Sequence, residues 1–177
     1  MTDFNEYYMV IALAVRERAN CIGRKVGAII VKDNRIIGTG YNGTPEGMQN
    51  CEDGGCIRCK KYRKKSQSYD KCICVHAEQN AMVTAARFGH SIQFSTIYTT
   101  LQPCFTCTKE FLQAKVKSVY YLEELDKPTD AHEKTEEEKD FDEQYHILIN
   151  RFEKHPTKID KNMLVDSINN IKDYLTK

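Results

Sequence analysis

The fold of this 177-residue chain is decided by two stretches, HAEQNAMVTAAR at residues 76–87 and PCFTCTKEFLQA at residues 103–114. The alanines and methionine of the first stretch, with Gly89 as a C-terminal stop, predict a helix over 76–87. Pro103 marks a turn into a second helix over 104–114. Strands are predicted over 96–100 and 116–122, so strands and helices alternate as in an α/β domain.

The N-terminal part of the chain predicts a helix followed by a hairpin. Phe4, Tyr8, Ile11 and Val15 form an apolar stripe within a helix over residues 3–19. Strands rich in Val and Ile are predicted over 25–31 and 35–39, with a tight turn between them. Because a hairpin joins these two strands, the sheet is expected to be mixed.

Composition limits the partners of the chain. Lys and Arg total 26 against 25 for Asp and Glu, so no overall field favours nucleic acid or an anionic membrane. Residues 1–10 lack a basic stretch followed by an apolar run, and no window approaches the length of a membrane span. We therefore expect a cytoplasmic protein that binds neither membrane nor nucleic acid.

The two helix starts carry a set of metal-ligand residues. His76, Cys104 and Cys107 supply one imidazole and two thiolates, which leaves a tetrahedral zinc ion a fourth position for water. Without a secretory signal, metal ligation explains the eight cysteines better than disulfides do. Each of these residues alone is ordinary, and Cys104 with Cys107 could belong to a structural zinc site. Their order and their places at helix starts favour a catalytic site.

Glu78 lies two residues after His76, beside the expected water position. Zinc lowers the pKa of bound water to about 7, and the carboxylate can move the released proton to a ring nitrogen and then to a leaving amine. This is hydrolytic deamination of an amidine-like carbon. His, Glu and a Pro-preceded Cys pair form the pattern of zinc nucleobase deaminases.

With these residues in hand, the chain resembles the cytidine and deoxycytidylate deaminase superfamily over about residues 5–121. The stretches VGAIIV at 26–31 and GYNGTP at 40–45, with HAEQNA at 76–81, resemble its deoxycytidylate (dCMP) deaminase branch. The resemblance implies a three-layer fold with helices on both faces of the sheet. It also implies conversion of dCMP to dUMP and ammonia, which feeds thymidylate synthesis, in a homo-oligomer such as a hexamer. Activation by dCTP with Mg²⁺ and inhibition by dTTP are further expectations from that branch.

The resemblance also assigns roles to individual residues. Glu78 becomes the proton shuttle beside the zinc held by His76, Cys104 and Cys107. Asn42 would hold the sugar, and the amide of Ala77 would hold the pyrimidine carbonyl. Asn42 could equally be a turn asparagine between glycines.

The substrate phosphate must meet positive charge. Arg24 and Lys25 are candidates for this contact, and they could equally be a solvated start of the first strand.

The cysteine-rich segment 41–75 has no clear period, so something must order it. Some members of the resembled branch hold a structural zinc near the positions of Cys21 and Cys51, with further ligands just before the catalytic histidine. A local alternative is the pair-and-pair spacing of Cys56, Cys59, Cys72 and Cys74. Both four-cysteine sets stay open, as do unligated buried thiols.

The chain is expected to divide into a deaminase domain, 1–122, and a C-terminal extension, 123–177. The extension starts with a charged linker and contains two amphipathic helical stripes that would pack on the same domain or on a neighbouring subunit. The stripes consist of Phe141, Tyr145, Leu148 and Phe152, and of Leu164, Ile168, Ile171 and Leu175. No strand is predicted here, although the resembled family usually continues with one.

Two other functions fit the same metal ligands. A tRNA adenosine deaminase would share them, but the net charge of +1 argues against RNA binding, except at the basic run Lys60, Lys61, Arg63, Lys64 and Lys65. A non-catalytic, zinc-stabilised binding protein would have no need of Glu78. Deamination of dCMP is the preferred interpretation.

Overall fold

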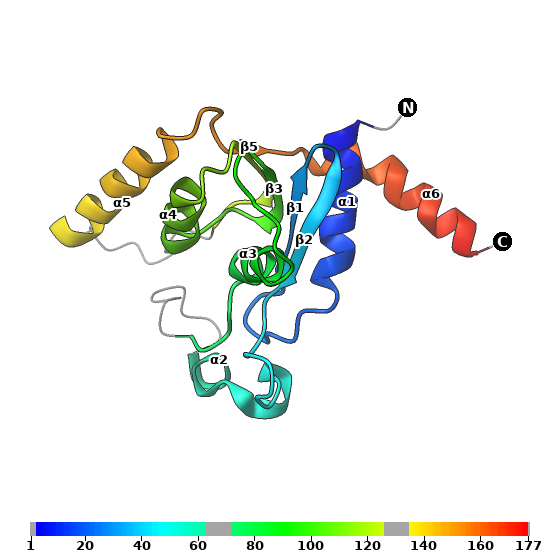
Figure 1. Cartoon of the computed structure of the whole chain (residues 1–177). Helices are drawn as coiled ribbons and strands as arrows, with labels where there is room; N and C mark the ends of the chain where they lie inside the picture. Colours follow the sequence, from blue (N-terminus) through cyan, green and yellow to red (C-terminus); the bar gives the residue numbers. More distant parts are fainter. Residues whose placement is uncertain (1–2, 63–71, 126–134, 177) are drawn as a thin grey trace.

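A computed structural model describes residues 3–62, 72–125 and 135–176 of the chain (Figure 1). In chain order the elements are α1 (Phe4–Arg16), β1 (Gly27–Lys32), β2 (Arg35–Tyr41), η1 (Cys51–Gly55), α2 (Ile57–Tyr62), α3 (Ala77–Arg87), β3 (Thr96–Leu101), α4 (Phe105–Gln113), β4 (Ser118–Glu123), α5 (Glu136–Ile149), β5 (Thr157–Lys158), η3 (Lys161–Leu164) and α6 (Val165–Leu175). The predicted helices and strands up to residue 123 are present, with ends that differ by a few residues.

The strands form one mixed sheet in the order β2-β1-β3-β4-β5. β1 is antiparallel to both β2 and β3, whereas β3, β4 and β5 run parallel to one another. The β1–β2 turn places Asp33 and Asn34 at positive φ (49° and 56°), the geometry that matches the twist of a hairpin. The predicted hairpin and the mixed sheet are thus confirmed.

Helices cover both faces of the sheet, which confirms the three-layer α/β architecture (Figure 1). On one face α3 and α4 bury Ala81, Ala85 and Phe111 against Ile30 and Ile97. On the other face α1 packs on β1 and β3. Small alanine side chains let α3 approach the sheet closely, and this places the first turn of α3 at the end of the strands.

The buried face of α1 includes most of the predicted stripe, since Tyr8 is buried and Ile11 and Val15 pack against the same core cluster. Tyr8, Met9 and Ala12 are buried, while Phe4 is 59% exposed. The helix ends at Arg16, so the predicted end at residue 19 was wrong. Met9 and Ala12 were not part of the prediction because the apolar residues of this helix form a broad band, and periodicity alone does not find its centre.

The segment 41–75 is not a structureless loop. Its base is closed by a bridge in which Val75 N–H donates to Gly43 O at 2.8 Å and Gly43 N–H donates to Val75 O at 3.3 Å. Beyond this base lie η1 and the short helix α2 (Figure 1). We call residues 43–62 and 72–75, together with residues 21–22 that pack against them, the cysteine lobe. Of the basic run, Lys60 and Lys61 lie in α2, and Arg63, Lys64 and Lys65 lie outside the described residues.

The C-terminal extension contains a strand that the sequence did not predict. β5 has two residues and pairs in parallel with Tyr120 and Tyr121 of β4. A pair this short leaves no periodic pattern, so no sequence signal predicts it. The expected charged linker lies partly outside the described residues, at 126–134.

The two helices of the extension pack differently. α5 contacts α4, where the rings of Phe105 and Phe141 lie 4.8 Å apart. η3 buries Leu164 against the α1 face of the sheet. α6 then extends away from the rest of the chain (Figure 1), with Ile168 and Ile171 44% and 50% exposed.

No helix among the described residues combines the length and the apolar character needed to cross a bilayer.

Candidate metal centre and active site

The three predicted zinc ligands meet at the starts of two helices. His76 is the N-cap of α3, and Cys104 is the N-cap of α4. The Nδ1 atom of His76 lies 3.4 Å from Cys104 Sγ and 3.4 Å from Cys107 Sγ. Tetrahedral zinc with Zn–S near 2.3 Å and Zn–N near 2.0 Å separates its ligand atoms by roughly 3.5 Å. The distances between these three ligand atoms therefore match the distances between ligands of a bound zinc ion.

Side-chain hydrogen bonds hold the backbone at each helix start and link the start of α3 to α4. The side chain of Gln79 accepts from the His76 backbone N–H at 3.2 Å and donates to Glu110 Oε1 at 3.0 Å. In α4 the hydroxyl of Thr108 donates to Cys104 O at 2.8 Å. These bonds hold the backbone of His76 and Cys104, so the ligand atoms start from a preset geometry.

Glu78 lies on the first turn of α3 and is only 5% exposed. Its Oε1 accepts a hydrogen bond from the Thr99 hydroxyl at 3.2 Å. Burial raises the pKa of Glu78 to about 7, and the bonds from its own N–H and from Thr99 only partly oppose this. A carboxyl group with that pKa can take up and release a proton at neutral pH.

The two thiols of the triad differ, because the hydrogen bond between them lowers the pKa of Cys104 and raises the pKa of Cys107. A hydrogen bond from Cys107 and the nearby His76 ring lower the pKa of Cys104 to about 4, against the opposing effect of burial. The lowered pKa favours the thiolate form of Cys104, which is the form that binds zinc.

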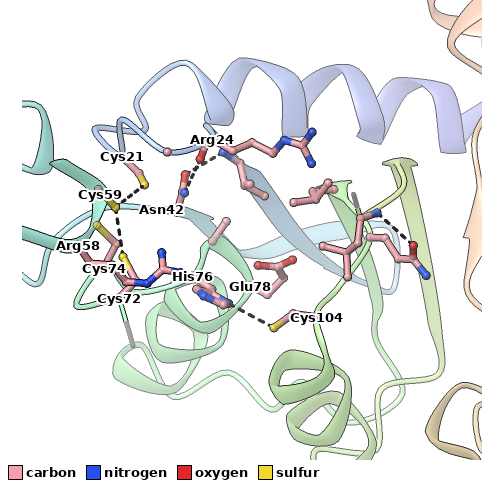
Figure 2. A pocket seen from close by; sticks show the side chains of 16 residues that line it. Cys21, Arg24, Asn42, Arg58, Cys59, Cys72, Cys74, His76, Glu78 and Cys104 are labelled. Carbon is pink, nitrogen blue, oxygen red and sulfur yellow. Dashed lines mark hydrogen bonds between the residues drawn. The ribbon is translucent and has the colours of Figure 1, made fainter. Parts of the chain in front are cut away.

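A cavity of about 290 Å³ opens beside the triad and is mainly apolar with a few polar groups, as ligand sites commonly are (Figure 2). Its lining residues are Cys21, Gly23, Arg24, Val26, Asn42, Arg58, Cys59, Cys72, Cys74, His76, Ala77, Glu78, Leu101, Gln102, Cys104 and Leu125. Figure 2 shows Glu78 close to Cys104 and His76, with the cysteine lobe on the far side of His76.

Three of the four predicted substrate contacts line this cavity. Ala77 is fully buried at the first position of α3, where backbone N–H groups have no acceptor within the helix. Arg24 also reaches the cavity, whereas Lys25 is exposed and is not among the lining residues. The structure thus brings Arg24, but not Lys25, to the site.

Asn42 lines the cavity while it braces the start of β1. Its Oδ1 accepts from Val26 N–H at 2.8 Å, and its Nδ2 donates to Arg24 O at 2.7 Å. An amide side chain has two donors and two lone pairs, so one of each is left for a ligand. Asn42 can therefore hold the backbone in place and contact a ligand at the same time.

Sequence reasoning missed Arg58, Gln102 and Thr99 at this site. Arg58 lies on α2, between Cys56 and Cys59 in the sequence. Its place within a cysteine pair of metal-binding spacing was the available signal. Gln102 precedes Pro103, but a lone glutamine in a turn carries no signal. Thr99 is a fully buried polar residue of β3, and only the packing of α3 on the sheet brings it to Glu78.

The six remaining cysteines also converge. Their sulfur atoms form two groups of four, Cys21, Cys51, Cys59 and Cys74, and Cys56, Cys59, Cys72 and Cys74. The two ligand sets that the sequence left open therefore overlap in space.

Comparison with known proteins agrees with this geometry. The sequence model of the family described as "Cytidine and deoxycytidylate deaminase zinc-binding region" matches residues 2–123. Deoxycytidylate deaminase of Schizosaccharomyces pombe is 40% identical over 121 residues, which are 67% of this chain and 37% of that protein. Deoxycytidylate deaminase of Mycobacterium phage D29 is 35% identical over 128 residues, which are 69% of this chain and 96% of that protein.

A solved structure gives the same result for the fold. The dCMP deaminase of cyanophage S-TIM5, crystallised in complex with dCMP and dUMP, is 32% identical and superposes with a TM-score of 0.59. The superposition covers 88% of this chain and 94% of that chain. The matched part is only 37% of the length of the Schizosaccharomyces pombe protein, and the same share of the deoxycytidylate deaminase of Saccharomyces cerevisiae, which is 40% identical over 119 residues. The chain belongs to the cytidine and deoxycytidylate deaminase family.

Proposed function

We propose that this chain is a zinc-dependent hydrolase that converts dCMP and water to dUMP and ammonia. The observation that carries the proposal is the buried Glu78 carboxyl, which faces the cavity beside the ligand atoms of His76, Cys104 and Cys107. The relatives named deoxycytidylate deaminase support the choice of substrate. So does the cyanophage enzyme, whose crystals hold dCMP and dUMP.

His76, Cys104 and Cys107 would hold the zinc ion, which supplies Lewis acidity and makes hydroxide available at neutral pH. The carboxyl of Glu78 takes the proton released by the attacking water and donates it to the ring nitrogen next to the reacting carbon. It then moves a second proton from the new hydroxyl to the amine as the carbon–nitrogen bond breaks. The Thr99 hydroxyl keeps Glu78 Oε1 in place during both transfers.

Three contacts would orient the nucleotide in the cavity. The free lone pair and N–H of the Asn42 amide suit a sugar hydroxyl, and the Ala77 N–H at the start of α3 suits the pyrimidine carbonyl. Arg24 is the proposed phosphate contact, and Arg58 on the cysteine lobe adds a second positive charge to the cavity wall. Regulation by dCTP with Mg²⁺ and by dTTP stays a prediction.

We also propose that the chain forms a homo-oligomer, for which a hexamer stays the expectation. The support is α6, whose apolar residues Ile168, Ile171 and Leu175 are 44%, 50% and 76% exposed. An isolated helix of this length is marginal in water, so a second copy of the chain would stabilise it by covering this face.

A nucleotide panel tests the proposed reaction. The zinc-loaded protein is incubated with dCMP, dCTP, cytidine and an adenosine-containing tRNA anticodon stem-loop, and ammonia release is measured. We expect the highest kcat/KM with dCMP. Activity on the RNA alone would make the chain a tRNA adenosine deaminase, and no turnover of any substrate would favour a zinc-stabilised binding protein.

A further inference from the structure

The cysteine lobe holds six cysteines that the proposed reaction does not use, in addition to the two of the triad. Within each of their two groups of four, all sulfur atoms lie within 4.8 Å of one another. Cys59 and Cys74 belong to both groups, while Cys21 and Cys51 belong to one and Cys56 and Cys72 to the other. The pattern is that of two tetrahedra that share an edge.

The distances between sulfur atoms match metal coordination. Cys21 Sγ lies 3.8 Å from Cys59 Sγ, Cys59 Sγ lies 3.3 Å from Cys72 Sγ, and Cys56 Sγ lies 3.5 Å from Cys72 Sγ. Four thiolates around one zinc ion are separated by roughly 3.8 Å, given Zn–S near 2.3 Å. A disulfide would need about 2.05 Å, so these cysteines are not paired covalently.

Backbone N–H groups point at the thiols that belong to only one of the two groups. Each of the four unshared sulfurs accepts backbone N–H groups: Cys21 from Gly23 and Arg24, Cys51 from Ile22, Cys56 from Cys59, and Cys72 from Cys74. The thiols of both kinds also contact one another: Cys59 contacts Cys21, Cys56 and Cys72, and Cys74 contacts Cys21, Cys51 and Cys72. Backbone donors of this kind stabilise a thiolate, which is the form that binds zinc.

The cysteine lobe has little else to hold it together. Its buried cluster, within the described residues, consists of Cys21, Cys51, Cys56, Cys59 and Cys74, with Ile22 and Cys72 partly buried against it. No larger apolar side chain belongs to this cluster of described residues, so hydrophobic burial contributes little. Metal binding is the usual source of stability for such a segment.

A single zinc ion would leave two of these buried sulfurs without a metal. A second ion binds them without adding net charge, because six thiolates with two Zn²⁺ ions carry the same charge as four thiolates with one. From this geometry we propose that the cysteine lobe holds two zinc ions in one cluster, bridged by Cys59 and Cys74. Cys21 and Cys51 complete the first ion, and Cys56 and Cys72 complete the second. The two ligand sets are thus two halves of one site.

The cluster forms one wall of the substrate cavity. Cys21, Cys59, Cys72 and Cys74 line the cavity opposite Cys104 (Figure 2). The bridging residue Cys74 lies two positions before His76, so the cluster fixes the chain that leads into the catalytic triad. Both cluster ions have four thiolate ligands and keep no open position for water, so this role is structural.

Metal counting and metal NMR test the proposal independently of any deaminase activity. Native mass spectrometry of the full chain, purified with its zinc, is expected to show three zinc ions per chain, one at the triad and two in the cluster. After exchange to cadmium-113, the two cluster ions are expected to give two resonances with mutual scalar coupling, which requires a shared thiolate. A total of two zinc ions, bound iron in place of zinc, or uncoupled cluster resonances would overturn the proposal.

Paired variants assign the ions to their ligands. The double variant Cys56→Ser, Cys72→Ser is expected to lose one ion and the coupling, while the matched control Cys104→Ser, Cys107→Ser loses one ion and keeps the coupling. Cys59→Ser is expected to weaken both cluster ions. Loss of coupling in the triad control, or a full metal count in the Cys56/Cys72 variant, would contradict the assignment. If the lobe variants fail to fold, the cadmium spectrum of the unmodified chain still decides.

Discussion

At the scale of single residues, Glu78 shows how burial selects a function. The same carboxylate at an exposed helix start would be an ordinary solvated charge. Under the first turn of α3, beside Thr99 and the triad, its pKa rises to about 7 and it becomes a proton carrier.

Glu78→Gln tests this role because it keeps the size of the side chain and removes its titration. We expect kcat for dCMP to fall by about 10²- to 10⁴-fold, with zinc content and thermal stability nearly unchanged. The assay is dUMP formation with metal analysis of the same sample. Glu46→Gln, at an exposed carboxylate, is the control and should keep full activity. Similar rates for both variants would exclude Glu78 as the proton shuttle.

Gly40 is important because it has no side chain. A Cβ added there would lie 2.1 Å from Ala77 O and 2.3 Å from Ala81 N, so β2 and the first turn of α3 are in direct backbone contact. Gly40→Ala is expected to lower the free energy of unfolding by about 1–3 kcal/mol, because α3 must shift. Urea unfolding measures this. Thr39→Ala, at an exposed position of the same strand, is the matched control, and an equal loss in both variants would contradict the close-contact argument.

At the scale of elements, α5 is tied directly to the metal-binding turn. The Tyr145 hydroxyl donates to Pro103 O at 2.5 Å, one residue before Cys104. Phe105 of α4 packs on Phe141 of the same helix. The C-terminal extension therefore supports the start of α4 rather than serving only as a cap on the edge of the sheet.

Tyr145 also makes this contact depend on pH. Burial raises the pKa of Tyr145 from 10 to about 12, so the folded state favours the neutral phenol. The stability that Tyr145 contributes is full below pH 10 and is lost as the pH rises through about 12. Urea unfolding of the natural chain and of Tyr145→Phe should therefore show a stability difference that shrinks over this range. A difference that stays constant with pH would refute the contribution of Tyr145 ionisation.

At the scale of the whole molecule, α6 indicates self-association. The helix contacts α1 at its start and then projects from the three-layer body (Figure 1), and its Ile168, Ile171 and Leu175 are 44%, 50% and 76% exposed. Ile171→Lys places a charge on this face, so it is expected to shift the chain to a smaller species in sedimentation velocity. Asn169→Lys, at an exposed polar position of the same helix, is the control and should keep the larger species. A natural chain that sediments as a monomer at all concentrations would contradict the oligomer.

Local patterns predicted much of this architecture. The hairpin, the helix starting at His76, and the strand–turn–helix around Pro103 each have signals within a few residues, namely β-branched runs, cap positions and turn residues. The three zinc ligands of the triad could be predicted for the same reason. Their spacing and the helix starts that carry them are features of short stretches of sequence. β5 and the buried face of α1 could not, because a two-residue pair and the centre of a broad apolar band depend on what packs against them.

The residues of the cavity also divide into those that the sequence indicated and those that only the tertiary structure brings there. Arg24 and Lys25 are equivalent in sequence, and only the turn of the backbone before β1 brings one of them to the cavity. Thr99 and Arg58 join the site from a strand and a lobe far from His76 in the chain.

The sequence by itself determined the fold class, the ligand types and the carboxylate beside them, since these follow from residue chemistry and short spacings. Only the tertiary structure decided how the cysteines are shared. Six cysteines spread from residue 21 to residue 74 allow many four-ligand sets, and spacing cannot rank them. The bridge between Gly43 and Val75 folds the lobe back on itself and places Cys59 and Cys74 within both groups. Contacts between residues far apart in the chain depend on that closure, and no local pattern encodes it.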